Sequence, residues 1–317
     1  MAQTSDHRNG ERLRKSSRIG LFDSGLGGLS VLTRLAAAIN PEERHQFIYL
    51  GDTARCPYGD RSPQEIVLFV KQIVNWLITQ DVDSIVMACN TSAAVSLDLA
   101  RQISPVPVYD LISPTAQFIA GRFNKVAVMA TASTIKSQAF SRSLRAINAE
   151  MGIVDLPCPD LVPLIESGQC GSPASREALK RYAERLLEER VEAVILGCTH
   201  FPFLRSQIVE LTGDEVEIID PAETLVLSMN PLPPPKEDMP AKKFGDSAAY
   251  ALNSRSIINT TGNPSKFRET AKICLGYALD TIIGITVDEL TAAAPTPKVL
   301  DGKVNANTVT PNMVPAT

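Results

Sequence analysis

Two cysteines stand at comparable places in the sequence. Cys89 follows the apolar run 84–88, and Cys198 follows the apolar run 193–197. A single cysteine after a buried strand is more often a small apolar residue than a reactive one. Two in matching positions favour a working pair, because one thiolate can remove a proton from one face of a substrate while the other thiol donates to the opposite face. We expect the helix after each cysteine to lower the pKa of its thiol through the helix dipole.

Other groups that can move protons stand near these cysteines. The chain has three histidines, and His200 alone lies among reactive side chains, just beyond Cys198. Asp23, at the end of the first predicted strand, is the matching candidate in the first half of the chain. His7 lies in a polar arm and His45 in a charged turn, so we expect both to be surface residues.

Other sites that the same residues could build are less favoured. Cys198 and His200 with a distant Cys89 lack the paired spacing of zinc ligands, so no metal is expected. The GxSxG elbow of a serine hydrolase is missing from the sequence. A cysteine amidase that uses Cys198, His200 and Glu166 stays open as an alternative.

The glycine loop after the first predicted strand does not match a dinucleotide-binding motif. Gly25, Gly27 and Gly28 depart from GxGxxG because Ser30 stands where the third glycine belongs. Backbone amides at a helix start could still bind a substrate carboxylate there, and a tight turn explains the glycines equally well. No nucleotide cofactor is therefore expected.

Alternating strands and helices must position these side chains. The predicted strands are 18–22, 46–50, 84–88, 106–109, 125–130, 193–197 and 216–219. The predicted helices are 62–80, 92–103, 137–150, 172–190 and 202–211. Buried strands that alternate with helices predict an α/β fold with mostly parallel sheets, covered by helices on both faces. Ligands of such sheets bind where the strands end at their carboxyl termini.

A weak internal repeat indicates two similar halves. Residues 82–89 resemble 191–198, and residues 18–22 resemble 125–129 at nearly the same spacing. The repeat puts Cys89 and Cys198 in equivalent places. A pseudo-twofold pair of thiols facing one cleft suits chemistry on two mirror-image substrates.

Composition limits the kind of protein and its partners. The 317 residues are 44% hydrophobic and carry a formal net charge of −4, which favours neither nucleic acid nor an anionic membrane as a partner. The apolar runs are too short to span a bilayer. The six cysteines include no CxxC pair, so we expect reduced thiols and a cytoplasmic location.

The remaining segments flank this alternating pattern. Residues 1–17 are polar and basic, without a secretory signal, and are expected to be a disordered arm. The Pro-rich segment 231–240 predicts a loop, after which 256–260 and 264–274 predict a further strand and helix. Residues 291–317 lack periodicity and are expected to form a disordered tail.

Several segments together resemble the glutamate racemases of bacterial cell-wall synthesis. The resemblance covers about 18–276, and its motifs are 20–30, 51–55 with 57–59, 89–91, 162–166, 196–202 and 260–264 through Phe267. It implies two similar α/β domains with the active site in the cleft between them. The implied domains are 18–112 plus 222–290, and 113–221.

The resemblance also implies the chemistry and the site residues. It implies cofactor-independent racemisation of L-glutamate and D-glutamate, which supplies D-glutamate for peptidoglycan, with no metal and with a homodimer as the assembly. Cys89 is expected to act on D-glutamate and Cys198 on L-glutamate, assisted by Asp23, Glu166 and His200. The implied substrate contacts are Ser24, Pro57, Tyr58, Gly59, Asn90, Thr91, Thr131, Thr134 and Thr199.

Some positions depart from the family pattern, and two other functions stay open. Cys56 adds a third sulfur near the expected site, and Ala132-Ser133 stands between the threonines of 130–134. Aspartate racemases usually carry an acidic residue where His200 stands, which favours glutamate here. The open alternatives are an aspartate or hydantoin racemase and a non-catalytic amino-acid binding protein.

Overall fold

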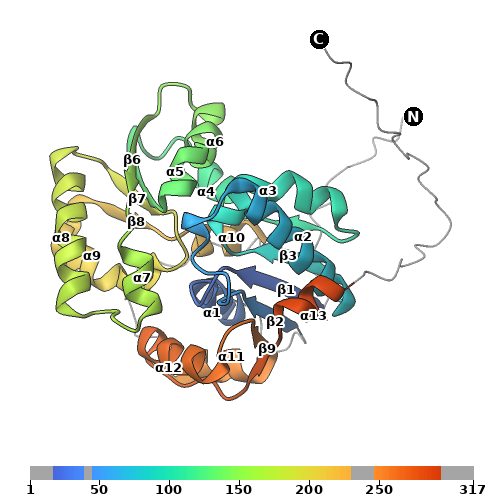
Figure 1. Cartoon of the computed structure of the whole chain (residues 1–317). Coiled ribbons are helices and arrows are strands. Elements are labelled where there is room, and N and C mark those ends of the chain that lie inside the picture. The colour runs from blue at the N-terminus through green and yellow to red at the C-terminus, as the bar shows by residue number, and fades with distance from the viewer. Residues whose placement is uncertain (1–16, 39–44, 230–245, 294–317) are drawn as a thin grey trace, which may run out of the picture.

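The computed structural model describes residues 17–38, 45–229 and 246–293. These residues form two parallel sheets side by side, with helices on both faces of each (Figure 1). The first sheet has the order β10-β9-β2-β1-β3-β4, and the second has the order β6-β5-β7-β8. The predicted fold of two parallel α/β sheets is confirmed.

The first sheet is built from the strands of the first half of the chain and from its last two strands. They are β1 (Arg18–Asp23), β2 (Gln46–Gly51), β3 (Ser84–Met87), β4 (Val108–Tyr109), β9 (Ser256–Thr260) and β10 (Ile282–Gly284). The second sheet consists of β5 (Lys125–Ala130), β6 (Gly152–Pro157), β7 (Ala193–Leu196) and β8 (Glu217–Ile219). All paired strands run parallel, so their carboxyl ends meet at one edge of each sheet.

Helices connect the strands. Those in the first half are α1 (Gly28–Ala38), η1 (Tyr58–Asp60), α2 (Pro63–Thr79), α3 (Asn90–Ile103) and α4 (Ile112–Ile119). Around the second sheet lie α5 (Ala132–Ser137), α6 (Ala139–Ile147), α7 (Leu161–Glu166), α8 (Pro173–Glu188), η2 (Phe201–Leu204), α9 (Arg205–Thr212) and η3 (Gly213–Glu215). The chain then returns to the first sheet through α10 (Pro221–Met229), α11 (Asp246–Arg255), α12 (Pro264–Leu275) and α13 (Val287–Ala292).

The two sheets share one topology. The order β2-β1-β3-β4 in the first sheet matches β6-β5-β7-β8 in the second. Consequently β1 corresponds to β5 and β3 corresponds to β7, the pairs that the internal repeat joins. Cys89 and Cys198 therefore follow equivalent strands.

Local sequence signals explain several helix boundaries. Ser62 and Glu65 form a capping box at the start of α2, with Pro63 at its first position. Asn263 caps α12 through Lys266 N–H, and Gly276 ends it in the left-handed conformation. These caps satisfy the backbone polar groups at the helix ends, and the apolar faces of the helices pack on the sheets.

Some predicted elements differ from the structure. The predicted helix 137–150 is broken by Gln138, whose φ of 57° ends α5 and begins α6. The predicted helix 202–211 begins as the 3-10 turn η2, and the predicted strand 106–109 keeps only its last two residues. The edge strands β6 and β10 escape sequence prediction because neither is a fully buried apolar run.

The ends of the fold also differ from the prediction. His45 is buried rather than at the surface, and its Nδ1 lies 2.6 Å from the hydroxyl of Ser17. Ser17 thus belongs to the fold rather than to the arm, and α13 includes the first residues of the predicted tail. His7 and the Pro-rich segment lie outside the described residues, and the domain boundaries stay a prediction.

No helix among residues 17–38, 45–229 and 246–293 is long and apolar enough to cross a membrane.

Packing around β1 generates a stability prediction. Leu21 on β1 is fully buried, whereas Leu68 on α2 is 51% exposed. We expect Leu21→Ala to cost about 2–5 kcal/mol of unfolding free energy, because it removes packed methyl groups and leaves a cavity. Leu68→Ala is the matched control and should change stability little. Urea unfolding monitored by circular dichroism measures both, and equal midpoints for the two variants would contradict the packing described.

Candidate active site

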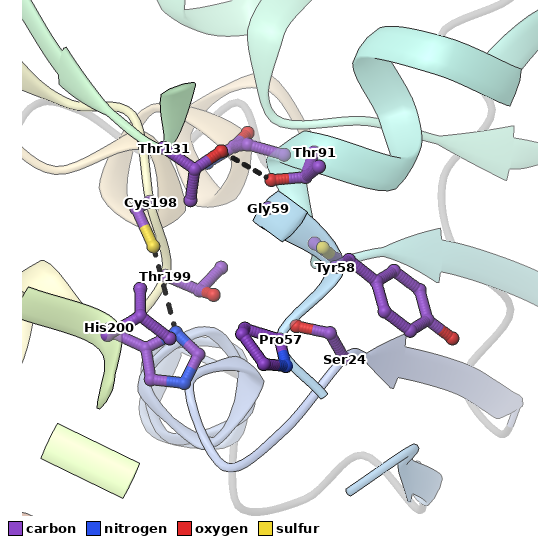
Figure 2. Close-up of a pocket in the computed structure, with 12 residues that line it drawn as sticks. Ser24, Pro57, Tyr58, Gly59, Thr91, Thr131, Cys198, Thr199 and His200 are labelled. Carbon is purple, nitrogen blue, oxygen red and sulfur yellow. Dashed lines mark hydrogen bonds between the residues drawn. The ribbon is translucent and has the colours of Figure 1, made fainter. Parts of the chain in front are cut away.

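The two sheets direct their carboxyl ends toward one small pocket. Its lining comes from the segments after β1, β2, β3, β5, β6 and β7, and Figure 2 shows the labelled side chains converging. The lining residues are Ser24, Pro57, Tyr58, Gly59, Cys89, Asn90, Thr91, Thr131, Val162, Cys198, Thr199 and His200. All but Val162 are among the residues that the sequence predicts for the site. Asp23, Glu166 and Thr134 lie behind the lining and contact it.

The side chains of Cys198, His200 and Glu166 contact one another in that order. Its Sγ lies 3.7 Å from His200 Nδ1 (Figure 2), and His200 Nε2 donates to Glu166 Oε1 at 2.7 Å. Burial disfavours the charged imidazole, but the Cys198 sulfur and the Glu166 carboxylate raise the pKa of His200 well above 6.5. Burial likewise disfavours the Glu166 charge, but the bond to His200 outweighs it and lowers the pKa of Glu166. The result is a partly buried ion pair directly beside the thiol, with His200 buried and the Glu166 side chain 21% exposed.

Glycines allow the loop after β1 to approach this ion pair. The Leu26 N–H donates to Glu166 Oε1 at 2.8 Å. A Cβ at Gly25 would lie 1.9 Å from that same oxygen, and a Cβ at Gly27 would lie 2.4 Å from His200 Nδ1. The sequence leaves open whether these glycines form a tight turn or bind an anion. In the structure they let the backbone approach the side chains of Glu166 and His200 closely.

Asp23 is the last residue of β1, in the first sheet. Its carboxylate accepts from the Gly25 N–H at 2.9 Å and from the Thr199 hydroxyl at 2.8 Å. Burial is the main cause of its raised pKa, and the nearby His200 charge opposes that shift. Since Thr199 follows β7, this bond joins the two halves of the molecule.

Cys89 is a buried thiol with a high pKa. It caps α3 without a side-chain bond to the helix, and only 4% of its surface is exposed. Burial, and next the Asp23 charge, raise its pKa to about 12. The prediction that the helix dipole lowers the pKa of this thiol is wrong, because desolvation and a neighbouring carboxylate outweigh the dipole.

The environment of Cys198 also differs from the prediction. The segment after it is the short 3-10 turn η2, and α9 begins only at Arg205. The expected α-helix dipole therefore does not act directly on Cys198. The nearest charge is instead the imidazole of His200.

Three threonine hydroxyls bond across the cleft. Thr91 Oγ1, from α3, lies 2.9 Å from Thr131 Oγ1 (Figure 2) and 3.0 Å from Thr134 Oγ1. Thr131 and Thr134 belong to the start of α5, next to the second sheet. Thr91 and Thr131 line the pocket, while Thr134 supports them from behind. Asn90 also lines the pocket, and its buried side chain has neither its amide nitrogen nor its oxygen bonded. This leaves a donor and an acceptor for a ligand.

A polar network that sequence analysis misses holds Tyr58 in place. Asp52 accepts from the Tyr58 hydroxyl, from Arg55 Nε at 2.6 Å and from the Thr261 hydroxyl at 2.8 Å. Asp52 follows β2 and Thr261 follows β9, which are neighbouring strands. The sequence identifies these residues as parts of motifs, but only the order of strands in the sheet shows that they are in contact.

Cys56 lies beside the site, as predicted from its position. Its Sγ and Glu166 Oε1 both lie within 3.1 Å of the point that a Cβ at Gly25 would occupy. Burial raises the pKa of its thiol above its usual range. Among the described residues, no cluster of three or more histidine, cysteine, aspartate or glutamate side chains could hold a metal ion.

Known proteins share both this fold and this sequence. The Asp/Glu/hydantoin racemase family model matches residues 19–229. The glutamate racemase of Desulforudis audaxviator is 42% identical over 264 residues, which cover 81% of this chain and 93% of that protein. A glutamate racemase isoform of Bacillus anthracis has a TM-score of 0.72 at 29% identity, covering 86% of this chain and 99% of that chain. The Francisella tularensis glutamate racemase, solved with D-glutamate, has a TM-score of 0.71 at 29% identity, covering 87% and 100%.

The fold and site define a two-sheet α/β isomerase with a pair of thiols in one pocket. The chain belongs to the Asp/Glu/hydantoin racemase family. The resemblance inferred from its motifs is confirmed, and so is the prediction of an amino-acid isomerase of this family.

The ion pair between His200 and Glu166 generates a prediction. We expect Glu166→Gln to lower the pKa of His200, because burial then acts on the imidazolium without a carboxylate to oppose it. An NMR titration of the imidazole measures the change. Glu177→Gln, on the exposed side of α8, is the matched control and should leave the His200 pKa unchanged.

The same pair sets a pH window for stability. Because folding raises the pKa of His200, its protonation stabilises the folded state. This contribution is complete below pH 6.5 and is lost as the pH rises through the folded-state pKa. Because folding lowers the pKa of Glu166, its ionised carboxylate stabilises the folded state. This contribution is present above pH 4.5 and is lost as the pH falls through the folded-state pKa. The free-energy difference between wild type and Glu166→Gln should therefore peak between 4.5 and 6.5. A difference that is flat from acid to alkaline pH would contradict this ion pair.

Proposed function

We propose that this protein interconverts L-glutamate and D-glutamate without a cofactor, with Cys89 and Cys198 as the two acid/base groups. The observation that carries the proposal is that these two thiols follow equivalent strands of the two sheets and line one pocket. Asp23 stands near Cys89, and His200 with Glu166 stands beside Cys198. Racemisation needs one base and one acid on opposite faces of the same carbon.

Each turnover moves one proton off the substrate and another proton on. From L-glutamate, Cys198 as thiolate takes the α-proton, and Cys89 as thiol gives its proton to the opposite face. Cys198 then carries the proton and Cys89 the negative charge, which is the starting state for D-glutamate. The high pKa of Cys89 supports its part as the proton donor in the first direction. His200 is positioned to exchange a proton with Cys198.

The substrate carboxylates are expected to bind to hydroxyls and amides of the pocket. Ser24, Asn90, Thr91 and Thr199 line it, and the unbonded amide of Asn90 offers both a donor and an acceptor. These groups would stabilise the negative charge that builds up as the α-proton leaves. Pro57, Tyr58, Gly59, Thr131 and Thr134 complete the proposed substrate contacts.

The substrate requires the pocket to widen. The cavity at the thiols is about 10 Å³, room for about one water molecule. A neighbouring cavity of about 310 Å³ shares Pro57 and Val162 with it. We propose that glutamate enters from that side as the two halves part, and that closure then excludes water from the thiols.

Glutamate is favoured over other substrates and a racemase over an amidase. The relatives described above are named glutamate racemases, and His200 stands where aspartate racemases usually carry an acid. A cysteine amidase would use Cys198, His200 and Glu166, but it would leave Cys89 in the same pocket without a part in the reaction.

The cellular setting is also a proposal. The family relationship supports supply of D-glutamate for peptidoglycan and a homodimer. The free cysteines support a cytoplasmic location.

The substrate prediction is tested by optical activity. Purified, reduced protein is incubated separately with enantiopure L-glutamate and D-glutamate, with no added cofactor. We expect both signals to decay to zero, because the two thiols serve either direction. Aspartate and hydantoins are run in parallel, and decay of one of these but not of glutamate would show that the substrate assignment is wrong. Binding of glutamate without loss of its optical activity would favour a binding protein.

The two-thiol mechanism is tested by replacing each cysteine. We expect Cys89→Ser and Cys198→Ser each to lower racemisation about 10²- to 10⁴-fold, the usual contribution of a general acid or base. Exchange of the α-proton for solvent deuterium is followed by NMR in both variants. Cys170→Ser removes a thiol outside the pocket lining and is the matched control. Near-normal turnover in either serine variant of the pocket would rule out the mechanism.

A further inference from the structure

Two cysteines outside the active site meet where the two halves of the molecule pack together. Cys170 lies in the segment between α7 and α8, beside the second sheet, and Cys274 lies on α12, beside the first sheet. Both are free thiols of intermediate exposure, and both pack against the same apolar core cluster. Neither takes part in the chemistry proposed for the pocket.

The backbone brings these two thiols together. Figure 1 shows α12 running beneath α7, and the two helices are in contact. A Cβ at Gly168 would lie 3.2 Å from Ile273 Cδ1, the neighbour of Cys274. Cys274 is the main influence on the pKa of Cys170, as expected for neighbouring thiols, and Cys170 Sγ donates to the Phe203 carbonyl oxygen at 3.6 Å.

The turn that carries Cys170 is well defined. Gly168 has a φ of 76°, and its N–H donates to the Ile165 carbonyl while that of Gln169 donates to the Leu164 carbonyl. This pair of bonds is the Schellman ending of a helix, which glycine favours because it adopts positive φ without strain. The turn follows α7, so Cys170 is held at a fixed place a few residues after Glu166.

We propose that Cys170 and Cys274 are an oxidative modification site, at which hydrogen peroxide forms a disulfide bond that ties the two halves of the molecule together. In its free-thiol form the molecule can open to admit substrate, and in its bridged form it cannot.

The reaction balances with peroxide as the only oxidant. The Cys170 sulfur attacks one peroxide oxygen, the O–O bond breaks, and a sulfenic acid and one water form. The Cys274 sulfur then attacks the sulfenic sulfur, the S–O bond breaks, and a second water leaves with the Cys274 proton. The two thiols lose two electrons, and one peroxide is reduced to two waters. A dithiol reductant returns both thiols by exchange.

The local environment favours this pair over the other thiols. The interaction with Cys274 lowers the pKa of Cys170, which increases its thiolate fraction, while the same interaction and burial raise the pKa of Cys274. Cys170 is therefore the thiol that reacts first with peroxide. Burial raises the pKa of Cys56, Cys89 and Cys158, which lowers the fraction of each that is thiolate. Cys170 and Cys274 are also more exposed than Cys89 and Cys198.

The bridge would act on the active site through the segments that it joins. Cys170 follows the helix that carries Glu166, while α12 contributes Phe267 to the larger cavity. A disulfide bond between them would oppose the widening that the pocket of about 10 Å³ requires. This effect on turnover rests on the proposed function, whereas formation of the bridge does not.

Peptide mapping tests whether the bridge forms. The full-length reduced protein is treated with hydrogen peroxide, its remaining thiols are alkylated under denaturing conditions, and its peptides are analysed by mass spectrometry without reduction. We expect a linked peptide pair containing Cys170 and Cys274, with Cys89 and Cys198 alkylated. Recovery of Cys170 and Cys274 both alkylated, or oxidised singly without a link, would overturn the proposal.

Turnover measurements test what the bridge does. Peroxide should abolish turnover of the wild type, and dithiothreitol should restore it. Cys170→Ser and Cys274→Ser, with normal turnover before treatment, should keep it after the same exposure. Equal loss in both variants, or full turnover of a bridged wild type, would contradict the proposed lock. Absence of turnover in the untreated protein would count against the proposed function, and the mapping would still decide the bridge.

Discussion

The partly buried ion pair between His200 and Glu166 is the interaction on which the site depends. It joins the segment after β7 to the end of α7, and the Leu26 N–H brings the loop after β1 to the same carboxylate oxygen. A charged pair is stable in such a place only when its hydrogen bonds are complete. The glycines at 25 and 27 are therefore required, because any side chain there would overlap Glu166 or His200. One electrostatic requirement thus constrains three distant parts of the chain.

Different neighbours surround the two pocket thiols, although both thiols are buried and their strands are equivalent. Cys89 is desolvated and faces Asp23, so it holds its proton strongly. Cys198 faces an imidazole whose pKa is raised. A symmetric fold therefore gives the two thiols unlike surroundings, which the proposed acid and base roles would use. The similar topology supplies the positions, and the unlike neighbours supply the difference.

Solvent exposure separates the cysteines by chemistry. Those in the pocket are buried, and a closed pocket protects them from reactions with small oxidants as well as from water. Cys170 and Cys274 lie at the seam between the halves, where partial exposure and mutual contact favour oxidation. The proposed opening of the pocket would part the molecule at this seam. A bond between those two sulfurs would therefore affect the pocket without touching it.

The sequence by itself determined the parallel strands, their repeat and the residues that end them. Runs such as 84–88 and 193–197 are buried on both faces, so their apolar character is local and readable, and Cys89, Cys198 and His200 follow them directly. Only the tertiary structure decided the rest. The edge strands β6 and β10 carry no continuous apolar signal, and the Asp52 network depends on the adjacency of β2 and β9. The high pKa of Cys89 arises from burial and from Asp23, a residue on another strand. Such properties come from contacts between segments distant along the chain, and local sequence patterns do not contain them.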